Sequence, residues 1–335
     1  MAIEFDRRIG AFQSLRDRMI EIDEDRKQHL FRSAEIQNPW FTTYNTQLAW
    51  KGIISMLDPA DLRSWVDNYP LRPSNSATVG IVMAGNLPLV GFHDLLCVLL
   101  SGHRAAVKMS SQDGILMGQM VQWLCELEPQ LTSFVEQREL LKDIDAVIAT
   151  GSDNSARYFN YYFGKIPHII RKNRTSVAVI DGDESPEEIR ALGHDIYSYF
   201  GLGCRNVSKV YVPQDFEITS IFPNLESYQK VIDHHKYRNN YDYNKSIYLV
   251  NKDPHLDTGF GLWVDSDELV SPISVTYWQR YAEQNELWEH LRKQEEKIQC
   301  IVGRNPKAIL FGSAQSPKVW DYADNVDTMA FLSGL

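Results

Sequence analysis

Residues 77–110 read ATVGIVMAGNLPLVGFHDLLCVLLSGHRAAVKMS, and the order of patterns within this stretch decides the fold. Residues 77–84 form a short apolar run of β type that ends at Gly-Asn-Leu-Pro. A helical pattern follows over 90–101 and is closed by Gly102, and residues 105–108 predict a second strand. A strand, a loop, a helix and another strand in this order are typical of a parallel sheet.

The alternation of strands and helices continues after this stretch. Residues 115–128 predict a second helix, and residues 146–150 predict a third strand before the loop GSDNS. Repeated alternation at this spacing predicts an α/β fold whose parallel sheet is covered on both faces. Residues 1–70 combine charge with helical periodicity and predict a helical entry segment. The elements expected further along are a strand at 176–180, an acidic turn at 181–186 that marks a lobe boundary, a helix at 187–200, strands at 207–212 and 246–250, and a helix at 278–297.

Length, composition and charge indicate a globular chain with two lobes. At 335 residues the chain exceeds what one hydrophobic core usually serves. Apolar residues make up 44% and charged residues 23% of the chain, a balance that argues against disorder. The formal net charge of −10, without a long basic stretch, argues against a nucleic-acid partner.

The N-terminal sequence and the most apolar window both argue against export or membrane insertion. The N-terminal stretch MAIEFDRRIGAF carries several charges and lacks the apolar core of a secretory signal. Asn86, His93 and Asp94 interrupt the window 79–102, and a lipid-exposed helix would hardly tolerate them. We therefore expect a cytoplasmic protein without a membrane span.

Among the cysteines, Cys204 alone is placed like a nucleophile. Cys97, Cys125 and Cys300 lie in apolar runs, whereas Cys204 stands in the glycine-flanked loop FGLGCRN. Glycine leaves room for a carbonyl to approach the sulfur, and the neighbouring Arg205 favours the thiolate. The alternative is a structural cysteine that acts as a small buried hydrophobe. Because no cysteine has a CxxC partner or a histidine at ligand spacing, we expect neither a metal site nor a disulfide framework.

Three further candidates follow strands of the predicted sheet. Asn86 lies in the loop after the first strand, Lys108 ends the second, and Thr150-Gly151-Ser152 follows the third. Open parallel sheets bind ligands at the carboxyl ends of their strands. Asn86 could there donate to an oxyanion, while Lys108 and the Gly-Ser pair could contact ribose or phosphate. The alternatives are a turn residue and solvated strand ends, and no GxGxxG fingerprint decides between these interpretations.

The order of these elements resembles the aldehyde dehydrogenase superfamily. In that superfamily a strand with Asn-x-Pro, a strand with Lys, a strand with Thr/Ser-Gly-Ser and a nucleophilic cysteine follow one another. The segments FGLGCRNVSKVYVP, DELVSPISV and FGSAQSPKVWDYADNVDTMAFL more closely resemble LuxC-type fatty-acyl-CoA reductases. The resemblance runs from about residue 79 to the C-terminus and is less specific before it.

The resemblance implies an aldehyde dehydrogenase-like α/β fold in three parts. Residues 1–185 would hold the helical entry segment and a Rossmann-like, parallel-sheet dinucleotide-binding domain. Residues 186–310 would form an α/β catalytic domain with the nucleophilic cysteine. Residues 311–335 would be a C-terminal segment that packs back or contributes to assembly, and a homo-oligomer is expected.

The resemblance also implies a role for each candidate residue. Cys204 would be the acyl-accepting nucleophile and Asn86 the oxyanion donor. The cofactor-binding residues would be Lys108, Ser110, Ser111, Gly151, Ser152 and Glu268, of which Glu268 would bind the nicotinamide ribose. Arg171, Arg174 and Arg205 are candidates for binding substrate or phosphate, against the alternative that the run RKNR is a solvated face.

Two departures from the ordinary aldehyde dehydrogenase pattern bear on the chemistry. Where oxidising members carry the glutamate of Glu-Leu-Gly-Gly, which activates the hydrolytic water, this chain has Arg171, which stays protonated and cannot act as a base. Where others have Lys-Pro-Ser-Glu, whose acid favours NAD, this chain reads KMSS at 108–111. A 2′-phosphate would meet no carboxylate at Ser111, so NADPH is expected in preference to NADH.

The sequence therefore predicts reduction of an acyl-CoA, with a fatty acyl-CoA as the expected substrate, to an aldehyde through a thioester on Cys204. NADPH would be the reductant and CoA the leaving group. One alternative is another acylating aldehyde dehydrogenase that acts on a short-chain or phosphorylated acyl donor. The others are a cysteine-dependent acyltransferase or thioesterase without hydride transfer, and a non-catalytic binding protein.

Overall fold

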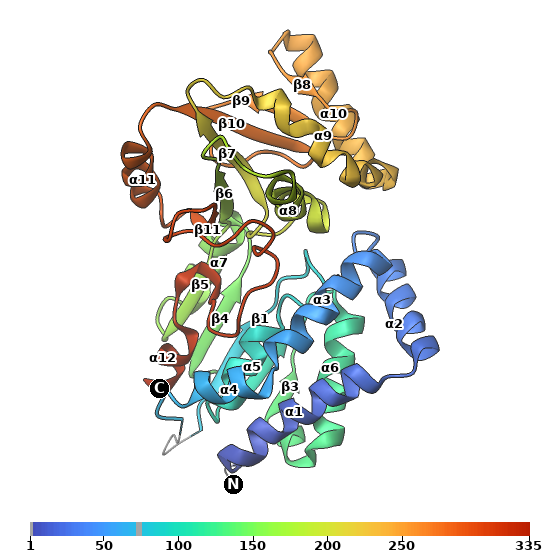
Figure 1. Ribbon diagram of the computed structural model, residues 1–335. Helices are drawn as coiled ribbons and strands as arrows, with labels where there is room; N and C mark the ends of the chain where they lie inside the picture. The colour runs from blue at the N-terminus through green and yellow to red at the C-terminus, as the bar shows by residue number, and fades with distance from the viewer. Residues whose placement is uncertain (1–2, 72–75) are drawn as a thin grey trace. The chain divides into compact units, whose positions relative to one another are not determined.

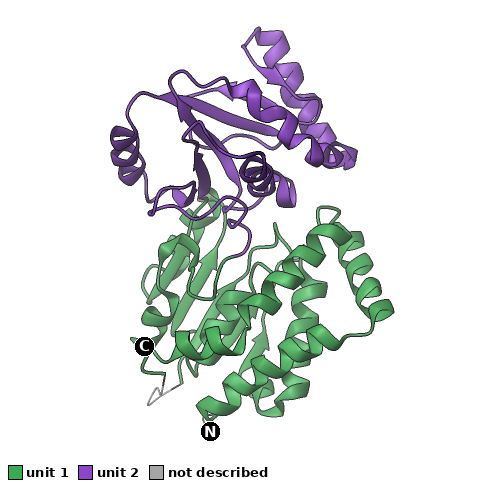
Figure 2. Cartoon of the chain, viewed as in Figure 1, with its two compact units in different colours: residues 1–173, 317–335 green, residues 174–316 purple. Residues whose placement is uncertain are grey.

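The computed structural model describes residues 3–71 and 76–335, and the chain divides into two compact units (Figure 2). Unit 1 consists of residues 1–173 and 317–335, and unit 2 consists of residues 174–316. The chain enters unit 2 ahead of the acidic turn, because the strand that precedes this turn pairs within the sheet of unit 2.

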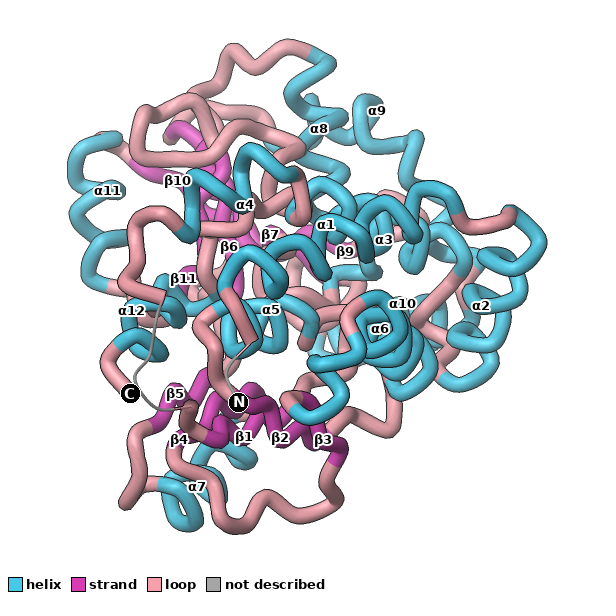
Figure 3. The backbone as a smooth tube through the Cα atoms, turned by 90° about the horizontal axis from the view of Figure 1, so that it is seen from below, coloured by secondary structure: helices cyan, strands magenta, loops and turns pink. Residues whose placement is uncertain are grey.

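Unit 1 is built on a parallel sheet with the strand order β3-β2-β1-β4-β5 (Figure 1, Figure 3). β1 pairs in parallel with both β2 and β4. The strands predicted at 77–84, 105–108 and 146–150 are therefore confirmed. The strands of this sheet are β1 (Thr78–Val82), β2 (Arg104–Lys108), β3 (Val135–Gln137), β4 (Ala146–Thr150) and β5 (His168–Arg171).

Helices cover both faces of this sheet (Figure 3). α5 and α6 lie on one face, and α7 contacts β4 and β5 on the other. Val79, Ile81 and Val107 are fully buried, as expected of strands in a sheet covered on both sides. The helices of unit 1 are α1 (Phe5–Glu21), α2 (Glu24–Gln37), α3 (Thr43–Met56), α4 (Pro59–Val66), α5 (Phe92–Leu100), α6 (Gly114–Leu127), α7 (Asp153–Phe163) and α12 (Thr328–Ser333), with 3-10 turns η1 (Pro129–Ser133) and η5 (Ala323–Asn325).

α5 is the helical part of the apolar window at 79–102. Almost every residue of its sequence FHDLLCVLL is buried, because β1 and β2 lie on one side and α1 and α12 also contact it. A helix that is apolar all round is typical of a core helix. Across the described residues, no helix combines the length and the apolar character that a membrane span requires.

Unit 2 contains a six-stranded sheet with the order β11-β6-β7-β10-β9-β8. Neighbouring strands run parallel except for β8 and β9. Its strands are β6 (Thr175–Val179), β7 (Val207–Pro213), β8 (Leu256–Asp257), β9 (Leu262–Asp265), β10 (Val275–Tyr281) and β11 (Ile298–Val302). Its helices are α8 (Pro186–Tyr197), α9 (Phe222–Leu225), α10 (His235–Asn251) and α11 (Gln284–Lys293), with 3-10 turns η2 (Ser198–Gly201), η3 (Ile218–Ile221) and η4 (Glu226–Asp233).

The strand predicted at 246–250 is wrong, because this segment is the C-terminal part of α10. Its sequence SIYLV favours a strand by local propensity. However, it continues a helix whose buried residues Tyr237, Tyr241 and Asn244 recur at helical spacing. The packing of that face overrides the local preference. The preceding polar stretch, which begins at His234, caps and forms the first half of the same helix.

The helix predicted at 278–297 is also wrong in its first part. Residues 275–281 form β10, which pairs in parallel with both β7 and β9, and the helix α11 begins only at Gln284. A central strand that is covered on both faces shows no alternation of polar and apolar residues. Its pattern therefore could not be separated from that of the adjoining helix.

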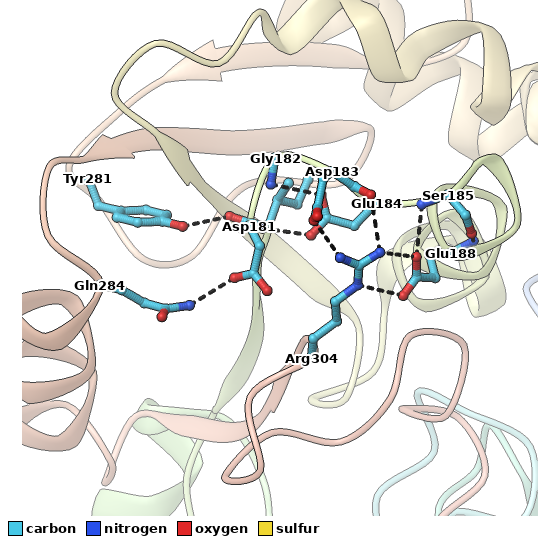
Figure 4. Close-up of polar contacts among 10 residues, drawn as sticks. Asp181, Gly182, Asp183, Glu184, Ser185, Glu188, Tyr281, Gln284 and Arg304 are labelled. Carbon is cyan, nitrogen blue, oxygen red and sulfur yellow. Dashed lines mark hydrogen bonds and ion pairs between the residues drawn. The ribbon is translucent and has the colours of Figure 1, made fainter.

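The acidic turn between β6 and α8 folds around Arg304 (Figure 4). The Arg304 guanidinium donates to both carboxylate oxygens of Glu188, at 2.8 and 2.6 Å, and forms an ion pair with Asp183. Ser185 and Glu188 form a capping box at the start of α8. Hydrogen bonds from Arg304 and from the Ser185 N–H lower the pKa of Glu188 to about 2. The acidic residues of this turn therefore organise the start of α8.

Candidate functional site

Unit 1 gathers several predicted site residues at the carboxyl edge of its sheet. β1, β2 and β4 run side by side, with Val82 of β1 opposite Lys108 and opposite Ala149. The loop with Asn86, the strand end at Lys108 and the segment after β4 therefore share one edge, where open α/β sheets bind ligands. Asn86 and Lys108 are exposed there.

The segment after β4 packs closely against the first turns of α7. Ser152 is the N-cap of α7, and its hydroxyl accepts from the Ser155 N–H at 3.3 Å. A side chain at Gly151 would place its Cβ 2.8 Å from the Ser155 Cβ and 3.0 Å from the Phe159 ring. Position 151 thus requires glycine, and the exposed start of α7 offers N–H donors to an anionic group.

Unit 2 holds Cys204 in a loop that is braced by hydrogen bonds. The Asn206 amide donates to the carbonyls of Ile196 and Ser198, at 3.3 and 2.8 Å, and its oxygen accepts from the Gly203 N–H at 2.8 Å. The Ser176 hydroxyl donates to the Cys204 carbonyl at 3.0 Å. Because Asn206 is only 2% exposed, this bracing is internal to the fold. It fixes the backbone on both sides of the half-buried Cys204.

The turn that leads into this loop has an unusual backbone. Tyr199 and Phe200 have positive φ angles of 51° and 58°, which side-chain-bearing residues rarely adopt. The Phe200 ring stacks on His234 with 4.4 Å between centroids and also contacts Tyr237. Aromatic packing thus holds a strained turn just before the Cys204 loop, a placement common at functional sites.

The loop that carries Glu268 lies against the strand that follows Cys204. Glu268 is exposed, and the neighbouring Leu269 carbonyl accepts from the Ser208 hydroxyl of β7 at 2.8 Å. The segments 200–208 and 271–276 line one cavity of about 30 Å³, and its lining includes Phe200, Asn206 and Pro272. Unit 2 therefore brings the Cys204 loop and the segment after Glu268 together.

The remaining cofactor candidates lie in the turn after β2. Ser111 is exposed and Ser110 is half-buried. The Ser110 hydroxyl accepts from the Gln112 N–H at 3.2 Å. Within the described part of the chain, no group of three or more His, Cys, Asp or Glu side chains is placed to hold a metal ion.

The three arginine candidates occupy different environments. Arg205 is half-buried beside Cys204. Arg174 donates to the carbonyls of Glu295 and Ile298, at 3.0 and 3.3 Å, so it ties the start of unit 2 to β11. Arg171 lies at the end of β5 and is only 3% exposed.

Arg171 joins β5 to two helices of unit 1. Its guanidinium donates to Asp94 of α5 at 2.6 Å and to the Thr328 hydroxyl of α12 at 3.0 Å. Burial acts to lower the pKa of Arg171, but the charge and hydrogen bond of Asp94 outweigh this effect, and the net shift is upward. Arg171 therefore stays protonated inside the fold. Sequence reasoning missed Asp94 as its partner, although an acid in an apolar helix was a visible signal.

We expect Asp94→Asn to lower the free energy of unfolding by about 3 to 5 kcal/mol, because it leaves the Arg171 charge buried without its counterion. Urea denaturation measures this loss. The control is the double variant Asp94→Leu/Arg171→Met, which removes both charges and should recover much of the stability. A loss below about 1 kcal/mol in the single variant, as for exposed ion pairs, would contradict the structural role of this pair.

The solved structures that share this fold include aldehyde dehydrogenases. Aldehyde dehydrogenase 21 from Physcomitrella patens, in complex with succinate, has a TM-score of 0.72 at 10% identity, over 99% of this chain and 84% of that one. The NAD+ complex of an aldehyde dehydrogenase from Bacillus cereus has a TM-score of 0.65 at 14% identity, over 91% and 73%. The Mycobacterium tuberculosis enzyme with NAD+ has a TM-score of 0.60 at 13% identity, over 84% and 69%. These likenesses confirm the predicted fold class.

The family comparison agrees with the resemblance seen in the sequence. None of the curated proteins compared with the chain matches it. The family model described as acyl-CoA reductase (LuxC) matches residues 55–222, which are half of the chain. This range includes Asn86, Lys108 and Cys204. The chain therefore belongs to the LuxC acyl-CoA reductase family and is an oxidoreductase that acts on acyl-CoA and aldehyde.

Proposed function

We propose that this chain reduces a fatty acyl-CoA to an aldehyde through a thioester on Cys204, with NADPH as the reductant. The observation that carries the proposal is the braced loop in which Asn206 and Ser176 fix the backbone around Cys204. A nucleophile needs a fixed position relative to the carbonyl that it attacks. Cys97, by contrast, is fully buried, and Cys300 lies within the strand β11.

The residues of the chain have distinct tasks in this proposal. The Cys204 thiolate attacks the thioester carbonyl of acyl-CoA, and the CoA thiolate leaves. Asn86 and the Cys204 N–H donate to the oxygen that becomes negative in the transition state. The Cys204 sulfur leaves again when the aldehyde is released, and it is then protonated to the thiol.

The carboxyl edge of the sheet in unit 1 fits a dinucleotide. Lys108 and Ser152 are exposed at this edge, and the start of α7 supplies backbone donors suited to phosphate. In unit 1, Lys108, Ser110, Ser111, Gly151 and Ser152 would hold the cofactor, and in unit 2 the resemblance offers Glu268 as a ligand of the nicotinamide ribose. NADPH, when bound, supplies the hydride that reduces the thioester.

Absorbance at 340 nm with NADPH and a panel of acyl-CoAs tests the function. NADPH consumption that requires both substrates supports the proposal. Thiol release without NADPH oxidation indicates a transferase or thioesterase, and no reaction at all indicates a binding protein. We further propose a cytoplasmic location, which the four free cysteines support. A homo-oligomer is proposed from the resemblance, and sedimentation velocity would measure the oligomeric state.

We expect a higher kcat/KM with NADPH than with NADH, because Ser111 is exposed and uncharged where an acid would repel a 2′-phosphate. Ser111→Glu should shift the ratio toward NADH by roughly tenfold or more, which corresponds to ~1.4 kcal/mol of charge repulsion. Ser111→Gln, which has a similar size without the charge, is the control and should shift the ratio much less. A wild-type preference for NADH would overturn this interpretation of the segment KMSS.

A further inference from the structure

The loop that carries Asn86 is locked to the turn after β2 by a buried carboxyl group. Oδ2 of Asp113 accepts a hydrogen bond from the Leu89 N–H at 2.7 Å. Asp113 is 1% exposed and Leu89 is 2% exposed, so water does not compete for this bond. The bond joins the loop of Asn86, the candidate oxyanion donor, to the turn of Ser110 and Ser111, the candidate cofactor contacts.

Leu89 needs this hydrogen bond because its backbone is strained. Its φ angle is 59°, in the left-handed region, where a residue with a side chain pays about 1 kcal/mol or more. Such a conformation persists only where the surroundings hold it. Leu89 lies three residues beyond Asn86, and the Asp113 carboxyl is placed to hold it in this conformation.

The other side of Asn86 is held by packing against the same turn. A Cβ at Gly85 would lie 2.2 Å from the Ser110 hydroxyl oxygen, so the backbone of the loop rests directly on this turn. The Asn38 amide donates to the Gly85 carbonyl at 3.4 Å. The loop is therefore fixed at Gly85 by contact and at Leu89 by Asp113, with Asn86 between the two.

The cost of burying Asp113 points to a role beyond stability. Its second oxygen, Oδ1, is buried and has no hydrogen-bond partner in the described structure. Burial raises the pKa of Asp113 to about 8, while the Leu89 hydrogen bond acts in the opposite direction. The carboxyl is therefore mainly protonated at neutral pH. A buried acid with only one of its two oxygens hydrogen-bonded is unfavourable for folding. A role in holding the strained Leu89 backbone would account for its presence.

We propose that Asp113 is a positioning residue for Asn86. Through the Leu89 N–H it fixes the loop 85–89, and it thereby sets the direction of the Asn86 amide toward the oxyanion. The inference rests on the proposed function, in which Asn86 is the oxyanion donor. It assigns to Asp113 an effect on acyl transfer to Cys204 and none on nucleotide affinity.

Two substitutions of Asp113 separate its hydrogen bond from its charge. Asp113→Asn keeps an oxygen acceptor for the Leu89 N–H and resembles the protonated acid, and Asp113→Leu removes the acceptor at similar volume. The measurement is the single-turnover rate of Cys204 acylation by an acyl-CoA without NADPH, followed by mass spectrometry. We expect a loss of about 10- to 100-fold for Asp113→Leu, since misplacing an oxyanion donor costs up to about 10²-fold, and a loss within about threefold for Asp113→Asn. The dissociation constant of NADPH, from fluorescence titration, should change less than about threefold in both.

A double-variant cycle with Asn86→Ala shows whether Asp113 acts through Asn86. In the Asn86→Ala background, Asp113→Leu should slow acylation by less than about threefold, because the group that it positions is gone. Additive losses, equal losses in the Asn and Leu variants, or an unchanged rate in Asp113→Leu would each overturn the inference. Asp113→Ala replaces the leucine variant if circular dichroism shows that the latter does not fold. Absence of acylation in the wild-type protein would instead overturn the proposed function.

Discussion

Cys204→Ala is expected to abolish acyl-enzyme formation and to lower aldehyde production by at least about 10⁴-fold, as removal of a catalytic nucleophile does in other enzymes. Neither Cys97 nor Cys125 is suited to replace it. Burial raises the pKa of the Cys97 thiol well above its usual value, and burial also raises the pKa of Cys125. Both thiols are therefore poor nucleophiles at neutral pH. The free energy of unfolding should change little, because Cys204 is only half-buried.

Mass spectrometry after incubation with acyl-CoA identifies the acylated residue directly. Cys125→Ala is a matched control, since this cysteine is also half-buried, and the variant should form the adduct at the wild-type rate. An adduct on Cys97, Cys125 or Cys300 would mean that the site has been assigned to the wrong residue. Similar thermal unfolding of the wild type and Cys204→Ala would show that any loss of activity comes from the chemistry.

The sheet of unit 1 was predictable because its signals are local. The apolar run that became β1 ends at a Gly-Asn-Leu-Pro loop, and Gly102 ends the helix pattern that became α5. Parallel pairing then places the residues after each strand at one edge, so Asn86 and Lys108 could be assigned to that edge from the sequence. In unit 2 the same rules failed for 246–250 and for 278–281, where burial on both faces or packing of a helix face decides the element.

The contacts that support the candidate site could not be predicted. Asn206 lies two residues after Cys204, but its hydrogen bonds to the carbonyls of Ile196 and Ser198 depend on how α8 ends. The bond from Leu89 to Asp113 requires a left-handed residue that no sequence rule assigns to leucine. Such partners are chosen by the folded backbone. Local patterns selected the candidate residues, whereas the groups that hold them became visible only in three dimensions.

Arg171 leads to the second prediction, which concerns the reaction run backward from aldehyde and NADP+. The resemblance places Arg171 where oxidising relatives carry the glutamate that activates water. The structure pairs its guanidinium with Asp94 at 2.6 Å and raises its pKa through that charge, although burial opposes the rise. A group that stays protonated and is bound inside the fold cannot accept a proton from water. Hydrolysis of a thioester on Cys204 should therefore be slow.

CoA should discharge the same thioester quickly, because it brings its own thiol as the nucleophile. Without CoA, we expect a burst of about one equivalent of NADPH per active subunit, and then a phase slower by about 10² to 10⁴, the usual contribution of a general base. With CoA, we expect continued turnover with acyl-CoA as the product. Stopped-flow absorbance at 340 nm resolves the two phases, and mass spectrometry identifies the products. As a control, the burst amplitude should rise in proportion to the concentration of enzyme whose Cys204 thiol is free to react. Rapid steady formation of NADPH and free fatty acid without CoA would show that a residue other than Arg171 activates water, and that the chain oxidises aldehydes by hydrolysis.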